Sequence, residues 1–225
     1  MSDDPRARMR ELAAEAMTAG APTAWFETLY QEAGENPATV PWVDLAPNPL
    51  FVAWFEREAP RPGNALVVGC GAGDDAAFLA SHGWQVTAFD IAPTAIAWSR
   101  ARFSDLAIDW QIADATKLPD AWRQTFDLVV EIYTLQTLPA SLRPDVLTAV
   151  GATLAPGGLL LVICRGRDPE TPEGVLPWKL TSAELSAPLA TSLMFVALED
   201  LLDGETPPQR RFRGLWRHPA LEPLT

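Results

Sequence analysis

The sequence has few basic residues. Lysine and arginine together number 17 against 29 aspartates and glutamates, which gives a formal net charge of −12 at pH 7. A protein of this charge repels the phosphates of nucleic acids and the headgroups of anionic lipids. We therefore expect neither nucleic acid nor a membrane surface among its partners.

Long hydrophobic runs are also absent. Residues 159–164 form one of the longest, far short of the ~20 residues that a membrane-spanning helix needs. The first residues carry Asp3, Asp4 and Glu11 and lack the apolar core of a secretory signal. The sequence therefore predicts a soluble protein of the cytoplasm.

Cysteine and histidine are scarce, with two of each, Cys70, Cys164, His82 and His218. These numbers predict neither a disulfide framework nor a metal site. His82 precedes Gly83 near the expected end of a helix, where an imidazole can bind the last carbonyl groups. We assign His82 this structural role and His218, in a polar C-terminal tail, no role.

Proline and tryptophan are abundant instead, with 21 and 9 copies in 225 residues. The prolines gather in residues 1–62 and 169–223, which predicts stiff loops on both sides of a regular middle region. A compatible interpretation is that these flanks fold over a ligand site and supply its aromatic walls. With 48% hydrophobic residues, the chain fits one domain with a sizeable core.

The chain alternates between short apolar runs and helical patterns. We expect strands at residues 65–68, 85–89, 108–112, 128–133, 159–163, 193–198 and 209–217. We expect helices at residues 5–20, 25–32, 50–58, 75–82, 93–103, 141–154 and 181–187, and a turn at residues 155–158. Strands that alternate with helices predict an α/β protein with a doubly wound sheet.

A glycine loop, Gly69-Cys-Gly-Ala-Gly73, directly follows the first of these strands. Its three glycines allow a tight turn and a close approach of the backbone to a ligand. Asp90 ends the next strand, about 20 residues further on, where a carboxylate can accept hydrogen bonds from both hydroxyls of a ribose. The combination predicts a site for a nucleoside-containing cofactor.

The residues beside the loop favour one such cofactor. A dinucleotide-binding loop has the spacing Gly-x-Gly-x-x-Gly, whereas this loop has Gly-x-Gly-x-Gly followed by Asp74 and Asp75. Two carboxylates at the N-terminus of a helix would repel a pyrophosphate, but they are compatible with an ammonium and a sulfonium cation. S-adenosylmethionine (SAM) has both cations, so we expect SAM rather than NAD or FAD.

Five motifs in chain order resemble those of the class I SAM-dependent methyltransferases. They are Gly69-Cys-Gly-Ala-Gly73, Phe89-Asp-Ile91, Ala113-Asp-Ala115, residues 126–131 with Leu138-Pro139, and residues 154–159. The resemblance covers most of the chain and implies a Rossmann-like, mostly parallel seven-stranded sheet. Residues 25–30, Pro41-Trp42 and Pro177-Trp178 further resemble the small-molecule branch that contains the thiopurine and the halide/thiol methyltransferases.

The resemblance implies roles for individual residues. The implied cofactor-binding residues are Gly69, Cys70, Gly71, Gly73, Asp90, Ile91, Asp114, Ala115 and Glu131. The residues that follow the fourth strand, Glu131, Tyr133 and Gln136, would face the substrate, and we take Glu131 and Tyr133 as the catalytic candidates.

Three further features of the sequence bear on this site. Trp25 and Trp42 would add aromatic walls that attract a sulfonium cation, or would pack an N-terminal helix onto the core. Family members commonly carry an acidic residue where this chain has Val67, which leaves Asp74, Glu131 or backbone carbonyls to bind the ammonium group. The cluster Arg210-Arg-Phe-Arg213 is expected on a solvated strand face, with contact to an anionic substrate group as the alternative.

Residues 1–48 lie outside the pattern of the sheet, and we expect them to form a helical lid on a SAM-binding domain of residues 49–225, within a single-domain protein. An isolated helix of this length is marginal in water and must pack its apolar face on another surface. Because helices cover both faces of the sheet, the open surface is the carboxyl edge, where a lid would exclude water. The alternative is a permanently docked helix far from the site.

The sequence thus predicts an enzyme that transfers a methyl group from SAM to a small-molecule nucleophile by in-line displacement, with a thiol or similar soft acceptor favoured. An N-, O- or carboxyl-methyltransferase of a metabolite is the first alternative. A SAM-binding module without activity and an NAD(P)-dependent oxidoreductase are two others. A general base is needed only if the acceptor must lose a proton at neutral pH. The sequence leaves the choice between monomer and homodimer open.

Overall fold

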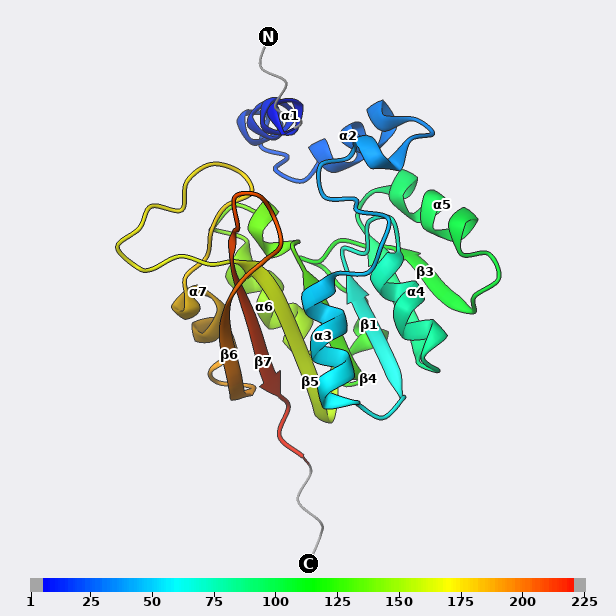
Figure 1. Cartoon of the computed structure of the whole chain (residues 1–225). Helices are drawn as coiled ribbons and strands as arrows, with labels where there is room; N and C mark the ends of the chain where they lie inside the picture. Colours follow the sequence, from blue (N-terminus) through cyan, green and yellow to red (C-terminus); the bar gives the residue numbers. More distant parts are fainter. Residues whose placement is uncertain (1–5, 221–225) are drawn as a thin grey trace, which may run out of the picture.

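The structure is a computed structural model that describes residues 6–220. These residues fold around one mixed sheet of seven strands in the order β3-β2-β1-β4-β5-β7-β6, in which β7 runs antiparallel to both of its neighbours (Figure 1). The strands are β1 (Asn64–Val68), β2 (Gln85–Asp90), β3 (Ile108–Ile112), β4 (Phe126–Ile132), β5 (Leu154–Arg165), β6 (Met194–Leu202) and β7 (Arg210–Arg217). The predicted doubly wound, mostly parallel seven-stranded sheet is confirmed.

Helices cover both faces of the sheet. The helices α3 (Pro49–Glu58), α4 (Asp74–Ser81) and α5 (Pro93–Arg102) supply core residues on one face. The helices α6 (Arg143–Gly151) and α7 (Ser182–Ser186) pack on the other face. Short 3-10 turns are η1 (Pro37–Thr39), η2 (Asp120–Trp122), η3 (Leu135–Thr137) and η4 (Ala187–Leu189). Within residues 6–220, no helix has the length and apolar character required to cross a membrane.

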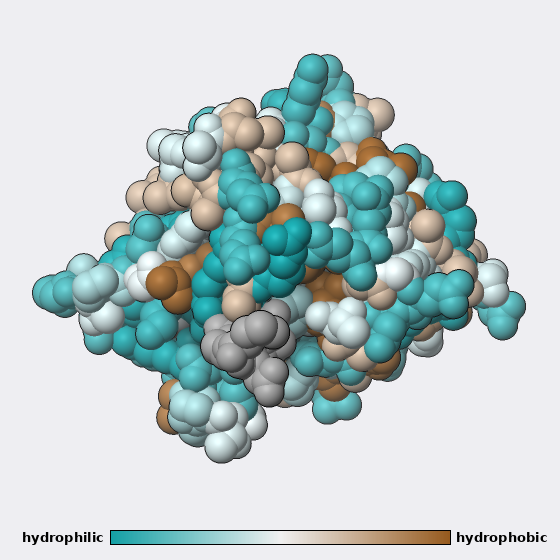
Figure 2. All heavy atoms as spheres, turned by 90° about the horizontal axis from the view of Figure 1, so that it is seen from above, coloured by the Kyte–Doolittle hydropathy of each residue, from teal (hydrophilic) through white to brown (hydrophobic). Residues whose placement is uncertain are grey.

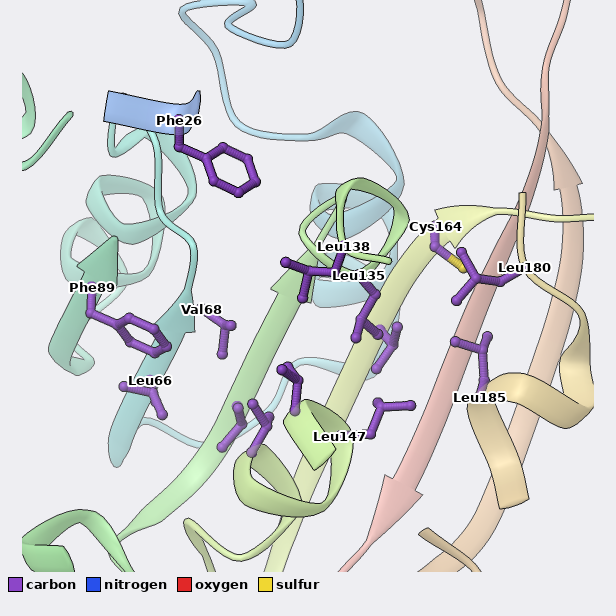
Figure 3. Close-up of a cluster of buried hydrophobic side chains, with 14 of the residues drawn as sticks. Phe26, Leu66, Val68, Phe89, Leu135, Leu138, Leu147, Cys164, Leu180 and Leu185 are labelled. Atoms are coloured by element: carbon purple, nitrogen blue, oxygen red, sulfur yellow. The ribbon is translucent and has the colours of Figure 1, made fainter. Parts of the chain in front are cut away.

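Strand β1 shows why the centre of the sheet is apolar on both faces. Ala65 and Val67 belong to the core beneath α3 and α4, whereas Leu66 and Val68 belong to the opposite core. Successive side chains of a strand point to opposite faces, and all four of these are buried. Figure 3 shows Leu66 and Val68 in one cluster with Phe89 of β2. A wholly apolar strand is typical of a parallel sheet that helices cover on both sides.

The segment 155–158 differs from the prediction. Strand β5 begins already at Leu154, and its register against β4 shifts before Leu159. Gly157 has a φ of 83°, a conformation that glycine adopts without a steric penalty. The predicted turn is therefore an irregularity within β5, because the strand continues to pair on both sides of it.

The N-terminal helices α1 (Ala7–Thr18) and α2 (Trp25–Ala33) lie over the carboxyl ends of the central parallel strands (Figure 1). Thr94, at the start of α5, donates its backbone N–H and its hydroxyl to the carboxylate of Glu27 on α2, at 3.0 and 2.7 Å. Glu27 thereby supplies the cap that the N-cap residue of α5 lacks. On α1, the Nε of Arg10 donates to the carbonyl of Leu176 at 2.9 Å. Both helices are thus tied to the body of the protein by polar contacts.

Replacing Glu27 by alanine should weaken the docking of α2. The variant leaves an N-terminal amide of α5 without its acceptor, so we expect the free energy of unfolding to fall by about 1–2 kcal/mol. Urea unfolding followed by circular dichroism measures this change. Glu35→Ala removes an exposed carboxylate just beyond α2 and should change stability by less than about 0.5 kcal/mol. Equal losses in the two variants would contradict the role of Glu27.

Candidate functional site

A cavity of about 440 Å³ opens at the carboxyl edge of the sheet. Strands β1 and β4 are neighbours there, yet the chain continues from β1 to β2 and β3 on one side and from β4 to β5 on the other. Open α/β sheets bind ligands in the crevice that such a reversal of strand order creates. Figure 2 looks down on this edge of the molecule, where hydrophilic side chains surround small apolar areas.

The glycine loop after β1 contributes to the wall of this cavity. Gly69 and Gly71 have φ angles of 58° and 53°, which residues with side chains rarely adopt. A Cβ atom on Gly69 would also collide with the side chain of Thr134, and one on Gly71 would lie 3.1 Å from the hydroxyl oxygen of Tyr30. The loop therefore requires glycine both for its backbone conformation and for the close approach of neighbouring segments.

Asp90, the last residue of β2, fixes this loop. Its Oδ2 accepts the N–H of Gly71 and its Oδ1 accepts the N–H of Ala92, both at 2.9 Å. Ser99 of α5 donates its hydroxyl to the carbonyl of Gly71 at 2.8 Å, so the loop is bonded from two sides. Burial raises the pKa of Asp90 to about 6, and the carboxylate is mostly ionised at neutral pH. Asp90 lines the cavity, and each of its oxygens has capacity for a further donor.

Three other residues that the sequence predicts for the cofactor, Ile91, Asp114 and Ala115, line the cavity beside Asp90. Asp114 follows β3, and its Oδ1 accepts the backbone N–H and the hydroxyl of Thr116, both at 2.8 Å. These bonds hold the turn after β3 at the edge of the cavity. The structure thus brings together residues from the ends of three neighbouring strands.

Aromatic side chains of the N-terminal segment form another wall. Phe26, Tyr30 and Trp42 line the cavity, and the indole N–H of Trp42 donates to the hydroxyl of Tyr30 at 3.0 Å. In Figure 3, Phe26 points from α2 toward the buried cluster. Trp25 lies behind these residues in the core, stacked on Phe26 with 4.0 Å between ring centroids and edge-on to Trp42 at 5.9 Å. Of the two predicted aromatic walls, Trp42 therefore borders the cavity and Trp25 supports it from the core.

The two carboxylates after the glycine loop are occupied by protein partners. Asp74 forms a bidentate ion pair with Arg102 of α5, with both contacts at 2.8 Å. Asp75 accepts the N–H of Asn48 at 2.7 Å, and burial raises the pKa of Asp75 to about 7. The expectation that Asp74 compensates a ligand ammonium is therefore not supported, because Arg102 already neutralises its charge.

Cys70 and Gly73 border a smaller hollow next to the cavity. Burial raises the pKa of the Cys70 thiol well above its ordinary value, so the thiol is not a nucleophile at neutral pH. Gly73 has a φ of 88°, and a Cβ atom there would lie 2.7 Å from the ring of Trp110 and 2.8 Å from the hydroxyl of Ser99. The third glycine therefore allows the start of α4 to pack closely.

Glu131 does not contribute to the lining of the cavity. Its side chain is 1% exposed, and its Oε1 accepts the N–H groups of Thr134 and Leu135 at 2.7 and 2.9 Å. Its Oε2 is buried without a hydrogen-bond partner among residues 6–220. In the structure Glu131 therefore positions the loop after β4, whereas the sequence analysis expects it to face a ligand.

Tyr133 and Gln136, from the same loop, do line the cavity. Tyr133 has a φ of 66°, an uncommon value for an aromatic residue and one of the strained conformations that gather at functional sites. Burial raises the pKa of Tyr133, so its hydroxyl stays protonated at neutral pH and can donate a hydrogen bond. Gln136 accepts the backbone N–H of Arg165 at 2.7 Å and thereby ties the loop to the end of β5.

Four lining residues come from the C-terminal part of the sheet: Arg165, Glu205, Thr206 and Arg211. The sequence pattern assigns no role to the first three, and it includes Arg211 only as a member of the cluster Arg210-Arg-Phe-Arg213. Arg165 ends β5, and Arg211 lies at the start of the antiparallel β7, beside it. The predicted solvated face of the arginine cluster is wrong for Arg211 and Arg213, which are 2% and 5% exposed. The arginine cluster is the one feature of the sequence that could have indicated this side of the site, because the sequence does not show that β5 and β7 are neighbours.

A comparison with known families agrees with this geometry. Residues 65–158 match the family model described as a methyltransferase domain. Over these residues the chain is similar to methyltransferase domains. The matched span begins in β1, and it includes the glycine loop, Asp90, Asp114 and the loop after β4.

The chain has curated relatives that match it over part of its length. The ubiquinone biosynthesis O-methyltransferase of Pseudomonas paraeruginosa (strain DSM 24068 / PA7) is 29% identical over 126 residues, which are 55% of this chain and 53% of that protein. The counterpart from Xanthomonas campestris pv. campestris (strain B100) is 30% identical over 125 residues, 54% of this chain and 52% of that protein. The chain thus spans about half the length of the curated relatives it matches.

Solved structures resemble the chain in fold. The 1,6-didemethyltoxoflavin-N1-methyltransferase of Burkholderia thailandensis has a TM-score of 0.69 and 20% identity, over 90% of this chain and 89% of that chain. A structure from work on the conversion of a disulfide bond into a thioacetal group during echinomycin biosynthesis has a TM-score of 0.73 and 23% identity, over 89% of this chain and 93% of that chain. At these identities the likeness concerns the fold alone.

The residues of the cavity fit SAM. Asp90 offers an ionised carboxylate, the backbone at Gly69 and Gly71 has no Cβ atoms in the way, and Trp42 presents an aromatic ring to which a sulfonium cation is attracted. The cavity volume of about 440 Å³ is in the range of small-molecule sites, roughly 300–1,000 Å³. Val67, which stands at the position of the family's common acidic residue, is buried in the core beneath α3 and α4.

Glu131→Gln tests the positioning role through the pH dependence of stability. Burial raises the pKa of Glu131 from 4.5 to about 7 in the folded protein. Ionisation of this carboxylate is thus unfavourable in the fold: the penalty is absent below pH 4.5, grows between pH 4.5 and about 7, and is constant at higher pH. Relative to the Gln variant, the wild type should lose on the order of 3 kcal/mol of unfolding free energy over this range.

Urea unfolding of both proteins across this pH range measures the difference. Glutamine keeps an oxygen to accept the N–H groups of Thr134 and Leu135, so the loop itself should be preserved. A difference between the two proteins that does not change with pH would contradict the raised pKa of Glu131.

Proposed function

We propose that the protein is a SAM-dependent methyltransferase that acts on a small molecule. The observation that carries the proposal is one cavity that joins two sets of residues. Gly69, Asp90 and Asp114 line it at the ends of β1, β2 and β3, whereas Tyr133 and Arg165 line it at the ends of β4 and β5. A nucleoside cofactor on the first side and an acceptor on the second would share one space, as an in-line displacement requires.

The chain's own residues would hold and orient the reactants. Asp90 would accept the ribose hydroxyls, the turn at Asp114 and Ala115 would border the adenine, and the backbone of the glycine loop would adjoin the methionine part. When bound, SAM supplies an electrophilic methyl group. The protein contributes alignment and the exclusion of water, for which the aromatic wall with Trp42 is placed at the cavity.

A thiol or similar soft nucleophile is the acceptor that we propose first. The two histidines bond to backbone carbonyls elsewhere, His82 to Phe78 at 2.7 Å and His218 to Pro219 at 2.9 Å, and Tyr133 stays protonated at neutral pH. A thiol has an ordinary pKa of about 8.5, against about 10 for a phenol, so a thiol depends less on a general base than a phenol does. The structural work on echinomycin biosynthesis likewise concerns sulfur chemistry, which is compatible with this proposal.

Methylation at oxygen is the second candidate. It is favoured by the curated relatives, whose names describe O-methyltransferases of ubiquinone biosynthesis. An oxygen acceptor would need either an acidic hydroxyl or a carboxylate lining the cavity as its base. Besides Asp90 and Asp114, the carboxylates of Asp44 and Glu205 line the cavity.

We further propose that residues 1–48 act as a lid on a SAM-binding domain of residues 49–225. Three of the lining aromatics belong to this segment, and α3 begins at Pro49, directly after it. Residues 1–5 lie outside the described part of the chain. We also propose that the protein is cytoplasmic and that it is a monomer or a homodimer. Its substrate would be a small molecule, and it would have no nucleic-acid partner.

Asp90→Ala tests the cofactor site. The variant removes a charged acceptor from the cavity, and we expect the affinity for SAM and for S-adenosylhomocysteine to fall at least about tenfold. Isothermal titration calorimetry measures both affinities, and circular dichroism checks the fold. Asp105→Ala, an exposed position after α5, should bind as the wild type does. An unchanged affinity in the Asp90 variant would contradict the ribose assignment.

A panel of acceptors tests the reaction. Thiols, phenols, amines and carboxylic acids are incubated with protein and SAM, and the release of S-adenosylhomocysteine is measured. Turnover of thiols alone supports the first candidate, and turnover of phenols or other hydroxyl compounds supports the second. Tight SAM binding without turnover of any acceptor would overturn the enzymatic proposal and favour a SAM-binding module.

A further inference from the structure

Two arginines lie directly opposite each other at the carboxyl edge of the sheet. Arg165 is the last residue of β5, and the antiparallel register of β5 and β7 pairs it with Arg211. Like charges in directly opposed positions of two strands destabilise a sheet. Both side chains line the cavity, so this unfavourable pairing is located at the site itself.

The two guanidinium groups are buried to different degrees and are unequally paired. The Arg211 side chain is 3% exposed; it donates to Asp203 at 2.6 Å and to Glu205 at 2.5 Å. The Arg165 side chain is 12% exposed, and its ion pair with Glu205 is long, at 3.8 Å. Arg6 lies at the same distance, 3.8 Å, from the same oxygen of Glu205. One carboxylate is therefore shared among three cations.

Each of the two arginines also has an unused donor. Within residues 6–220, the Nε of Arg165 and the Nη1 of Arg211 are buried and have no hydrogen-bond partner. Burial lowers the pKa of Arg165, and the charge of Arg211 acts in the same direction, whereas the charges of Glu205 and Asp203 oppose it. Buried donors are nearly always paired in folded proteins, so the hydrogen-bonding capacity of these two guanidinium groups is incompletely used among the described residues.

The surrounding residues hold the pair in place. The guanidinium of Arg211 lies over the ring of Tyr133, 4.6 Å from its centroid, and Tyr133 in turn borders the hollow beside the glycine loop. The backbone N–H of Arg165 is bonded to Gln136. The two arginines are thus fixed on the acceptor side of the cavity, next to the proposed cofactor site.

We propose that Arg165 and Arg211 bind an anionic group of the methyl acceptor, and that the substrates of this enzyme are small carboxylic acids that carry the nucleophile elsewhere in the molecule. A carboxylate matches the planar donors of a guanidinium, and it would give Arg165 a closer charged partner than Glu205, which lies 3.8 Å away. This inference rests on the proposed methyltransferase function and names the class of its substrate. The anionic group is recognised here and is not the atom that is methylated.

Matched pairs of acceptors test the proposal, because each pair differs only in charge. The pairs are 3-mercaptopropionate with 3-mercaptopropionamide, and 4-hydroxybenzoate with 4-hydroxybenzamide. For the wild type we expect kcat/KM to be at least about tenfold higher for the acid than for its amide, in whichever pair is turned over. Equal values for acid and amide would overturn the proposal while leaving the methyltransferase function intact.

Substitution of Arg165 supplies the second arm of the test. Arg165→Gln should remove the preference for the acid mainly through a higher KM, and Arg165→Lys should restore part of it. Arg123→Gln, an exposed arginine before β4, is the matched control and should keep the wild-type preference. Arg165 has one long ion pair, so its replacement should leave the fold intact, as thermal unfolding would verify.

Binding measurements separate this inference from the failure of the proposed function. The two acids and their amides are titrated into protein saturated with S-adenosylhomocysteine. Acid binding that depends on Arg165 supports the inference even where no acceptor is methylated. If Arg165→Gln instead weakens the binding of S-adenosylhomocysteine tenfold and leaves acid binding unchanged, the arginine serves the cofactor carboxylate and the proposal is wrong.

Discussion

The site depends on the hydrogen bond from the Gly71 amide to the buried carboxylate of Asp90. This bond joins the loop after β1 to the end of β2, and it requires Gly71 to adopt a positive φ so that its N–H faces the carboxylate. Burial makes ionisation of Asp90 less favourable, and backbone amides of the loop and of Ala92 offset that effect. The residue that fixes the loop therefore also provides the charge that a ribose would meet.

The N-terminal segment depends on this arrangement in turn. Tyr30 approaches Gly71 closely enough that a Cβ atom there would lie 3.1 Å from its hydroxyl oxygen, and Glu27 caps α5, the helix whose Ser99 holds the Gly71 carbonyl. The aromatic wall, the helix α5 and the glycine loop thus form one connected unit. A change in any of the three would alter the shape of the cavity, because side chains are close-packed between them.

Charge is distributed differently on the chain as a whole and at the cavity. The net charge of −12 describes the sum over the molecule, whereas two arginines, Arg165 and Arg211, line one side of the cavity. Composition indicates which large partners are repelled at a distance. Composition does not indicate which ligand group a buried pair of guanidinium groups would bind, because that depends on their neighbours and on their burial.

The sequence by itself determined the order of strands and helices along the chain and the residues that follow β1, β2 and β3, because local periodicity and glycine residues act over a few positions. It did not determine that Glu131 binds the backbone of the loop after β4, that Arg102 forms an ion pair with Asp74, or that Arg165 lies opposite Arg211. Those contacts join residues far apart in the chain or depend on a side-chain direction. They were decided by the tertiary structure, where strand neighbours, burial and competing partners are set by the packing of the whole domain.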